Sequence, residues 1–279
     1  MTTSHFEEAS NKLMSRGGTP TFASKFDQRL HFAMYVPREL DLTDPAPLVV
    51  IQHGTGRTGM RYRDQMRDWA DEHGAILLIP TFPAGIIDEY DLHNFKFIEY
   101  KGIRFDHALL SMVDEVAERY NVYKDKFYLH GFSGGGQFVH RFLYLHPERL
   151  AAVSIGAPGR LTELDDTKEW WIGTKGFAEK FGHAPDIDAI RNVPVHMVVG
   201  ADDVTTAEIN NPGESNWMDG VELQGDTRVA RLETLKRNYE SHGIDVEMDI
   251  VPGVAHMGSG VLPAVEAYFS KQIKAGAHR

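Results

Sequence analysis

Short apolar segments alternate with amphipathic ones along most of the chain. Segments rich in Val, Ile, Leu and Phe, bounded by glycine, proline or polar residues, predict buried strands at 47–52, 75–80, 126–130, 151–155, 193–199 and 246–251. Between them, apolar residues recur three or four positions apart and predict helices near 59–73, 106–120, 135–146, 226–242 and 261–274. Because strands and helices alternate, we expect an α/β fold with a mostly parallel sheet covered by helices on both faces.

The chain is expected to form a single domain over residues 1–279, because no repeat, low-complexity tract or linker divides it. Residues 1–20 are expected to be a loose or helical N-terminal extension. The pattern over residues 21–36 predicts a β-hairpin. At the start of the helix pattern near 106–120, Asp106 is expected to cap the helix.

The most informative motif is a serine that lies between glycines directly after the predicted strand 126–130. Residues 131–135 read Gly-Phe-Ser-Gly-Gly and lead into the helix pattern 135–146. This is the G-x-S-x-G pattern in the strand–turn–helix context that gives it meaning. The glycines permit a tight turn, and the N–H groups that begin the helix point towards any oxyanion formed there. We therefore predict that Ser133 is a nucleophile.

A nucleophilic serine needs a base and a group that orients the base. In the order typical of such sites, an acid follows one late strand and a histidine follows the next. Asp202 and Asp203 follow the strand 193–199, and His256 follows the strand 246–251 after a Pro-Gly break. We predict His256 as the base and Asp203 as its partner, with Asp202 forming the turn. Spacing alone leaves the choice between the two aspartates open.

A serine nucleophile also needs donors for the oxyanion. One should be the backbone N–H of Gly134, which directly follows the nucleophile, and the other should come from the loop after the strand 47–52. In that loop we favour the N–H of Thr55, with Gly56 as the alternative. One such donor stabilises the transition state by about 2.7–4 kcal/mol.

The same loop carries a second motif, because residues 54–59 read Gly-Thr-Gly-Arg-Thr-Gly after a strand. Dinucleotide binding would also require an acidic residue at the end of the next strand, where it binds the ribose. The strand 75–80 ends without one. Neither H-E-x-x-H nor a G-K-[ST] phosphate loop occurs in the sequence. We therefore expect no cofactor and no metal, and we expect Arg57 to be a solvated loop cation.

Taken together, these motifs make the sequence similar to the α/β-hydrolase superfamily, nearest in pattern to the esterase and polyhydroxybutyrate-depolymerase-like branch. The resemblance implies an eight-stranded-type sheet and a serine hydrolase that cleaves carboxylic esters through a Ser-His-Asp triad and an acyl-enzyme intermediate. The matching segments are 53–55, 131–136, 144–154, 200–203 and 253–256, which together span the chain from about residue 30 to its end.

Other functions use the same residues. A thioesterase, an amidase or a C–C bond hydrolase would carry the same triad, and the sequence does not distinguish them. A receptor that binds a small ligand without catalysis is the alternative from another class. Such proteins typically lose a member of the triad, whereas Ser133, His256 and Asp203 are all present here.

Several long segments are expected to cover the site. The segment 159–188 predicts a small lid insertion, and its Trp170 and Trp171 would suit an apolar or aromatic part of an ester substrate. The segments 82–104 and 205–225 are also long enough to border the pocket. We also expect His53, in the loop after the strand 47–52, and Phe132, directly before Ser133, to contact substrate.

Composition excludes several classes of partner. The net charge is −11 and no basic block occurs, so we expect neither nucleic acid nor a membrane surface as a partner. Cysteine is absent, which excludes disulfides and a thiolate nucleophile. The polar, acidic start of the sequence and the lack of a long apolar segment predict no signal peptide, no membrane span and a cytoplasmic location. A small-molecule ester is the expected partner, and assembly into a homo-oligomer is left open.

Overall fold

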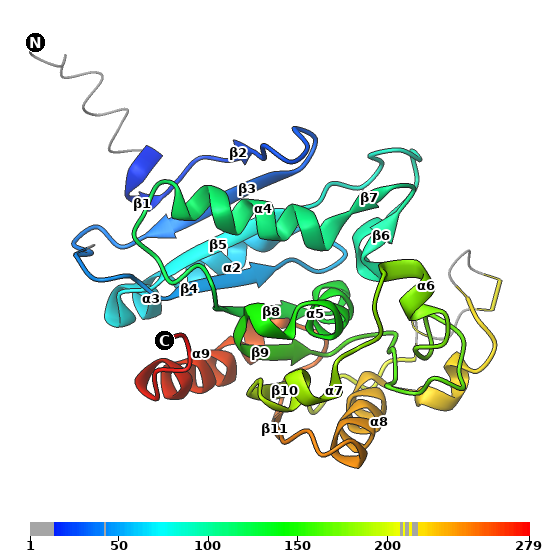
Figure 1. Cartoon of the computed structure of the whole chain (residues 1–279). Helices are drawn as coiled ribbons and strands as arrows, with labels where there is room; N and C mark the ends of the chain where they lie inside the picture. Colours follow the sequence, from blue (N-terminus) through cyan, green and yellow to red (C-terminus); the bar gives the residue numbers. More distant parts are fainter. Residues whose placement is uncertain (1–13, 42, 207–208, 210–211, 214–216) are drawn as a thin grey trace, which may run out of the picture.

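The computed structural model of the chain describes residues 14–41, 43–206, 209, 212–213 and 217–279. Its described helices and strands follow one another as a mixed α/β sequence (Figure 1). In chain order they are β1 (Gly17–Gly18), β2 (Phe22–Ala23), β3 (His31–Val36), β4 (Leu48–Gln52), α2 (Gly59–Gln65), α3 (Arg67–His73), β5 (Ile76–Thr81), η1 (Asn94–Phe97), β6 (Glu99–Tyr100), β7 (Ile103–Arg104), α4 (Phe105–Ala117), β8 (Phe127–Phe132), α5 (Gly134–Leu145), η2 (Pro147–Arg149), β9 (Leu150–Gly156), α6 (Phe177–Phe181), α7 (Ile187–Arg191), β10 (Val195–Gly200), η3 (Val221–Gln224), α8 (Arg228–Ser241), β11 (Val246–Val251) and α9 (Gly258–Lys274).

The described strands form one large, mostly parallel sheet. Its order is β1-β3-β5-β4-β8-β9-β10-β11, and β2 pairs with β3 outside this path. β3 runs antiparallel to β5, whereas β5, β4, β8, β9, β10 and β11 pair in parallel. Helix α3 contacts α9 on one side of the sheet, and α4 and α5 cover the other side (Figure 1). The predicted α/β fold with a mostly parallel, helix-covered sheet is therefore confirmed.

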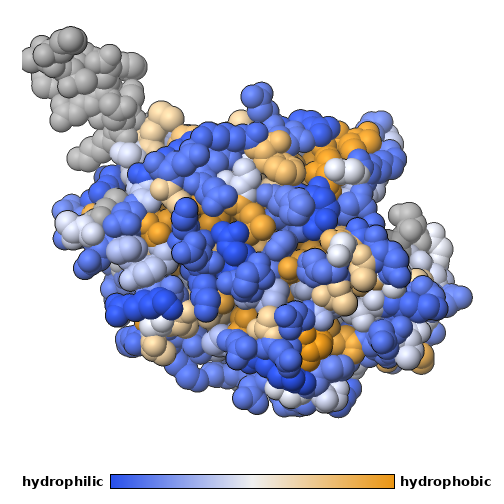
Figure 2. Space-filling model, in the orientation of Figure 1, coloured by the Kyte–Doolittle hydropathy of each residue, from blue (hydrophilic) through white to orange (hydrophobic). Residues whose placement is uncertain are grey.

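The central strands are apolar because both of their faces are covered. Every residue of β4, β8, β9 and β10 is buried, which is the pattern of parallel strands that lie between two layers of helices. On the face drawn in Figure 2 the surface is mainly hydrophilic, and hydrophobic side chains reach it only in separate areas. No helix in the described part of the chain is long and apolar enough to cross a membrane.

The predicted elements differ from the observed ones mainly at the N-terminal side. The predicted hairpin over 21–36 is present as the antiparallel pair of β2 and β3. Most of the predicted extension 1–20 lies outside the described residues, but Gly17 and Gly18 pair with Val36 and Tyr35 of β3. The prediction of a loose or helical segment is therefore wrong at β1, because two residues without side-chain periodicity carry no strand signal.

Asp106 is part of a buried ionic cluster rather than a helix cap. Its side chain is fully buried and accepts hydrogen bonds from Arg104 (2.8 and 2.5 Å) and from Nε2 of His146 (2.8 Å). Burial opposes ionisation of this carboxyl, but the hydrogen bonds from His146 and Arg104 outweigh it and hold its pKa well below the usual range. Asp106, His107 and His146 offer three potential metal ligands, yet Arg104 already contacts both carboxylate oxygens.

This cluster predicts a specific loss of stability in acid. In the unfolded chain the Asp106 carboxyl has a pKa of about 3.9, and in the folded protein its pKa is lower. The ionised carboxylate therefore stabilises the fold above pH ~4, and this stabilisation is lost as the pH falls further. We expect Asp106→Asn to lower the free energy of unfolding at pH 7 by about 3 kcal/mol, because Arg104 and His146 lose their partner. Urea denaturation from pH 7 to pH 3 checks this. If the free energy of unfolding of Asp106→Asn stays below that of the wild type by the same amount from pH 7 to pH 3, the assignment is contradicted.

Candidate active site

Ser133 lies in the sharp turn between β8 and α5. Its backbone has φ 59° and ψ −115°, a conformation that costs energy for a residue with a side chain. The N–H of Ser133 donates to the carbonyl of Gly156 on the neighbouring strand (2.8 Å), which fixes the turn against β9. A Cβ at Gly135 would lie 2.5 Å from the carbonyl oxygen of Gln52, so the turn requires glycine at that position. The glycine at position 135 of the motif is therefore a steric requirement of the turn.

The structure brings His256 between Ser133 and Asp203. Nε2 of His256 lies 3.0 Å from Oγ of Ser133, and Nδ1 lies 2.6 Å from Oδ2 of Asp203. The carboxylate can only accept, so Nδ1 carries the proton and Nε2 accepts from the serine hydroxyl. Asp203 is 1% exposed and accepts from His256, whereas Asp202 is exposed. The geometry thus joins Asp203, and not Asp202, to the histidine.

Two loops at the carboxyl ends of neighbouring strands hold this arrangement. Asp203 follows β10 and His256 follows β11, and the N–H groups of Ala201 and Asp202 donate to the carbonyls of Val251 and Val254 (2.8 and 2.9 Å). Parallel strands end at the same edge of a sheet, which is where open α/β sheets form their sites. These backbone bonds set the distance between the acid and the histidine.

The predicted oxyanion donors lie close to each other beside Ser133. The backbone nitrogen of Thr55 is 3.0 Å from the position that a Cβ on Gly134 would occupy, and Thr55 lines the cavity over the serine. Arg57, expected to be a solvated cation, instead donates to the carbonyls of Thr55 (2.6 Å), Phe82 (3.1 Å) and Leu92 (2.9 Å). That prediction is wrong, because the guanidinium braces the loop that carries Thr55.

His53 does not line the cavity, contrary to the prediction that it contacts substrate. Its side chain is fully buried; Nε2 accepts from the N–H of Phe82 (2.9 Å), and Nδ1 lies 2.8 Å from the carbonyl of Gly54. Burial lowers the pKa of His53 to about 3, so the ring stays neutral. Both ring nitrogens are used by the backbone, and His53 therefore shapes the loop instead of meeting a ligand.

The prediction that Trp170 and Trp171 contact substrate over Ser133 is also wrong. Neither belongs to the described lining of the Ser133 cavity. Trp170 packs edge-on against Phe177 and Phe181 of helix α6, with ring centroids 5.5 and 5.0 Å apart. Trp171 packs against Phe97 and lines a neighbouring cleft of about 810 Å³, which shares His93 with the Ser133 cavity. Trp170 thus packs on α6 and Trp171 on η1, and both anchor the segment 159–188 through contacts that a sequence pattern does not reveal.

Arg141 of helix α5 ties this segment to the body of the protein. The side chain is fully buried, and its guanidinium donates to Oγ1 of Thr162 (2.8 Å) and to the carbonyl of Lys96 (2.7 Å). It also lies 5.7 and 5.9 Å from the rings of Trp171 and Trp170. Burial lowers the pKa of Arg141 to about 9, which leaves it charged at neutral pH. Motion of the segment as a lid stays a prediction.

The cavity over Ser133 has a volume of about 540 Å³. Phe132 borders it as expected, with its ring centroid 4.9 Å from that of His256. All three long segments contribute residues to its walls. These are Leu92, His93 and Lys96 from the segment 82–104, Gly159 and Arg160 from 159–188, and Ile209 from 205–225, together with Tyr62, Gln137 and Arg228.

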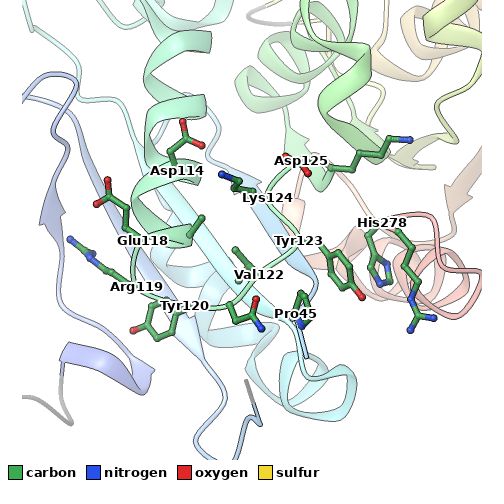
Figure 3. A pocket seen from close by; sticks show the side chains of 14 residues that line it. Pro45, Asp114, Glu118, Arg119, Tyr120, Val122, Tyr123, Lys124, Asp125 and His278 are labelled. Atoms are coloured by element: carbon green, nitrogen blue, oxygen red, sulfur yellow. The ribbon is translucent and has the colours of Figure 1, made fainter. Parts of the chain in front are cut away.

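A larger cleft of about 1040 Å³ lies elsewhere and shares no described residue with the Ser133 cavity. It is formed by the end of α4, the loop 119–126 and the C-terminal residues His278 and Arg279 (Figure 3). Lys126 in its wall directly precedes β8, whereas Ser133 directly follows that strand. The cleft is therefore separated from the serine by the length of β8, and its charged residues are of both signs.

Comparisons with known proteins agree with this architecture. No family model matches the chain. Among curated proteins, feruloyl esterase B of Thermothelomyces thermophilus is 26% identical over 124 residues, which are 44% of this chain and 42% of that protein. The matched region thus spans less than half of the curated relative.

Solved structures match over nearly the whole chain. Poly(aspartic acid) hydrolase-1 from Sphingomonas sp. KT-1 superimposes with a TM-score of 0.73 and 22% identity, covering 91% of this chain and 98% of that one. A poly(3-hydroxybutyrate) depolymerase from Bordetella parapertussis has a TM-score of 0.73 and 21% identity, covering 96% and 95%. A ferulic acid esterase has a TM-score of 0.62 and 14% identity, covering 92% and 99%. With this sheet order and these neighbours, the chain has the α/β-hydrolase fold and is similar to the poly(3-hydroxybutyrate) depolymerase and feruloyl esterase branch of that fold.

Proposed function

We propose that this protein is a serine hydrolase that cleaves carboxylic esters through an acyl-enzyme intermediate. The observation that carries the proposal is the position of His256, whose two ring nitrogens lie 3.0 Å from the Ser133 hydroxyl and 2.6 Å from the Asp203 carboxylate. A nucleophile, a base and a buried group that orients the base are the parts that such catalysis needs.

In the first half of the reaction, Oγ of Ser133 attacks the ester carbonyl carbon while Nε2 of His256 takes the hydroxyl proton. The resulting imidazolium stays hydrogen-bonded to Asp203 through Nδ1–H, and the carboxylate stabilises its charge. Collapse of the tetrahedral intermediate breaks the bond to the alcohol, which leaves with the proton from Nε2. The acyl group is then bound to Ser133.

In the second half, water takes the place of the alcohol. Nε2 of His256 removes a proton from the water as its oxygen attacks the acyl carbon, and returns the proton to Oγ of Ser133 as the carboxylic acid leaves. In both halves the negative oxygen would accept hydrogen bonds from the N–H groups of Gly134 and Thr55. Donors preorganised in this way favour the transition state over the bound ester.

Three of the four similar proteins support the ester assignment at the level of reaction class, whereas poly(aspartic acid) hydrolase-1 is named for a polymer joined by amide bonds. A feruloyl esterase, a ferulic acid esterase and a poly(3-hydroxybutyrate) depolymerase are all named for hydrolysis of esters. A thioester, an amide or a C–C bond beside a carbonyl would use the same residues, so a panel of substrates that differ only in the scissile bond selects among them.

Covalent labelling tests the proposal most directly. A fluorophosphonate probe should modify the folded protein, and mass spectrometry of the digested sample should locate the adduct on the peptide that contains Ser133. Hydrolysis of 4-nitrophenyl esters should be lost in proportion to the labelling, because an activated serine carries both reactions. If the folded protein takes up no label, the site is not catalytic and the ligand-binding alternative replaces the proposal.

A further inference from the structure

The carboxylate of Asp203 has two described side-chain partners, one for each of its oxygens. Oδ2 lies 2.6 Å from Nδ1 of His256, and Nη1 of Arg228 donates to Oδ1 across 3.4 Å. Asp203 is 1% exposed and Arg228 is 3% exposed, so both members of this ion pair are shielded from water. Arg228 is therefore in direct contact with the acid that orients the histidine.

A buried carboxylate is costly unless charged groups and hydrogen bonds compensate for its lost hydration. His256 uses Oδ2 and leaves Oδ1 to another donor. Arg228 supplies that donor together with a positive charge. Without Arg228, Oδ1 would lose its described donor, and the carboxylate would be held towards His256 from one side only.

The position of Arg228 is set by the start of helix α8. Arg228 is the first residue of α8, and the side chain of Thr227 caps the helix by accepting from the N–H of Ala230 (3.1 Å). One turn later, Arg231 donates to the carbonyl of Gly225 (2.9 Å) and ties the helix to the preceding loop. Helix α8 packs on β10, the strand that leads to Asp203. This packing brings the arginine and the aspartate together across 25 residues of sequence.

We propose that Arg228 is a positioning residue of the catalytic site, which holds the Asp203 carboxylate in the orientation that His256 needs. The inference rests on the proposed function, because it adds a residue that acts behind the triad. Arg228 acts on the carboxylate, and only through it on the histidine. Hydrogen bonds to charged groups are stronger than neutral ones, and burial of this pair strengthens the effect.

One effect opposes this role. When His256 becomes an imidazolium in the transition state, a second cation beside the same carboxylate repels it. The contact distances favour positioning, because His256 is the closer partner at 2.6 Å and Arg228 contacts the other oxygen at 3.4 Å. We therefore expect the loss of orientation to outweigh the relief of repulsion, so that kcat falls when Arg228 is replaced.

Arg228 also lines the cavity over Ser133, so direct contact with the substrate is the competing role. The two roles have different kinetic signatures. A positioning residue lowers kcat with little change in KM, and its effect disappears once the carboxylate that it holds is neutralised. A residue that binds the ester raises KM, and its effect is the same whether or not Asp203 is charged.

The central variant is Arg228→Met, made alone and in the Asp203→Asn background, with Arg237→Met as the matched control. Arg237 is an exposed cation of the same helix, and its described hydrogen bond is to Thr234 (2.9 Å). We expect Arg228→Met to lower kcat for a 4-nitrophenyl ester by roughly 10- to 100-fold, as for the loss of a buried hydrogen bond to a charged group. KM should change less than about twofold. Arg237→Met should have the kinetics of the wild type.

Two further comparisons separate positioning from a general loss of structure. Arg228→Lys should keep most of the activity, because the contact uses a single guanidinium nitrogen and does not need the fork of an arginine. In the Asp203→Asn background, Arg228→Met should change kcat by less than about threefold. Thermal melting verifies that each variant is folded. If Arg228→Met does not fold, Arg228→Gln against Arg228→Lys provides the same test of the charge.

The proton on Nδ1 of His256 reports on the same hydrogen bond without any substrate. Its NMR resonance should lie far downfield in the wild type, because the bond to Asp203 is short and charge-assisted, and Arg228→Met should shift or broaden it. An equal loss of kcat in both backgrounds, a rise in KM alone, or a rise in kcat in Arg228→Met would overturn the inference.

The NMR signal also separates the two proposals. If the wild type hydrolyses no ester but the resonance responds to Arg228→Met and not to Arg237→Met, the ester-hydrolase assignment fails and the positioning of Asp203 and His256 by Arg228 stands. If esters are hydrolysed and Arg228→Met changes neither kcat nor the resonance, the positioning role fails and the hydrolase assignment stands.

Discussion

Ser133→Ala should lower kcat for 4-nitrophenyl ester hydrolysis by roughly 10⁴-fold or more while leaving the fold intact. The substitution removes the nucleophilic oxygen, and His256 then has no hydroxyl at 3.0 Å to deprotonate. Packing should change little, because the Ser133 backbone bond to Gly156 does not involve the side chain. Steady-state kinetics, with thermal melting of both proteins, measures the effect.

Ser154 provides a matched control for this variant. Its hydroxyl lies 2.9 Å from Nδ1 of His196, whose Nε2 lies 3.2 Å from Asp249, so the three residue types of a triad are again in contact. Ser154 and His196 are fully buried within the sheet, where no substrate reaches them. We expect Ser154→Ala to keep the kcat of the wild type per folded molecule. Activity that survives in Ser133→Ala and is lost in Ser154→Ala would refute the assignment.

Asp203→Asn should lower kcat by about 10⁴-fold, the second largest effect that we expect. An asparagine has the same size, but it presents either an amide N–H or an uncharged oxygen to Nδ1 of His256. The first favours the wrong tautomer of the histidine, and the second withdraws the charge that stabilises the imidazolium. The 2.6 Å contact between the two side chains makes this loss direct.

Asp202→Asn is the control for that substitution, because it changes the adjacent aspartate in the same way. Asp202 is exposed, and its described hydrogen bond to Val254 comes from the backbone N–H. We expect kcat to change less than about threefold, as for a surface substitution worth roughly 0.5 kcal/mol. The reverse ranking of the two variants, measured on the same ester, would transfer the role of the acid to Asp202.

Local sequence patterns were most informative where the structure depends on neighbouring residues. The strand–turn–helix motif at Ser133 is specified by glycines that the backbone requires, as the 2.5 Å approach to Gln52 at Gly135 demonstrates. The aspartates and His256 could be placed because parallel strands end at one edge of the sheet. The choice between Asp202 and Asp203 needed the structure, since adjacent residues in a turn point in different directions.

Side chains in the long irregular segments were predicted least well. His53, Trp170 and Trp171 have residue types that suit substrate contact, yet they serve the loop and the segment 159–188. Burial decides between these roles, and burial in an irregular segment depends on what packs over it. Helix α6, which covers Trp170, is only five residues long and comes several positions later in the chain.

The sequence by itself determined the α/β order of the elements, the position of the turn at Ser133 and the order of serine, acid and histidine. Each of these follows from hydrophobic periodicity or from backbone sterics within a few residues. Only the tertiary structure decided which charges meet over the serine. Lys96, Arg160 and Arg228 come from three segments far apart in the chain, and no periodic pattern encodes their side-chain directions. Their convergence depends on the packing of those segments against helix α5 and the sheet edge.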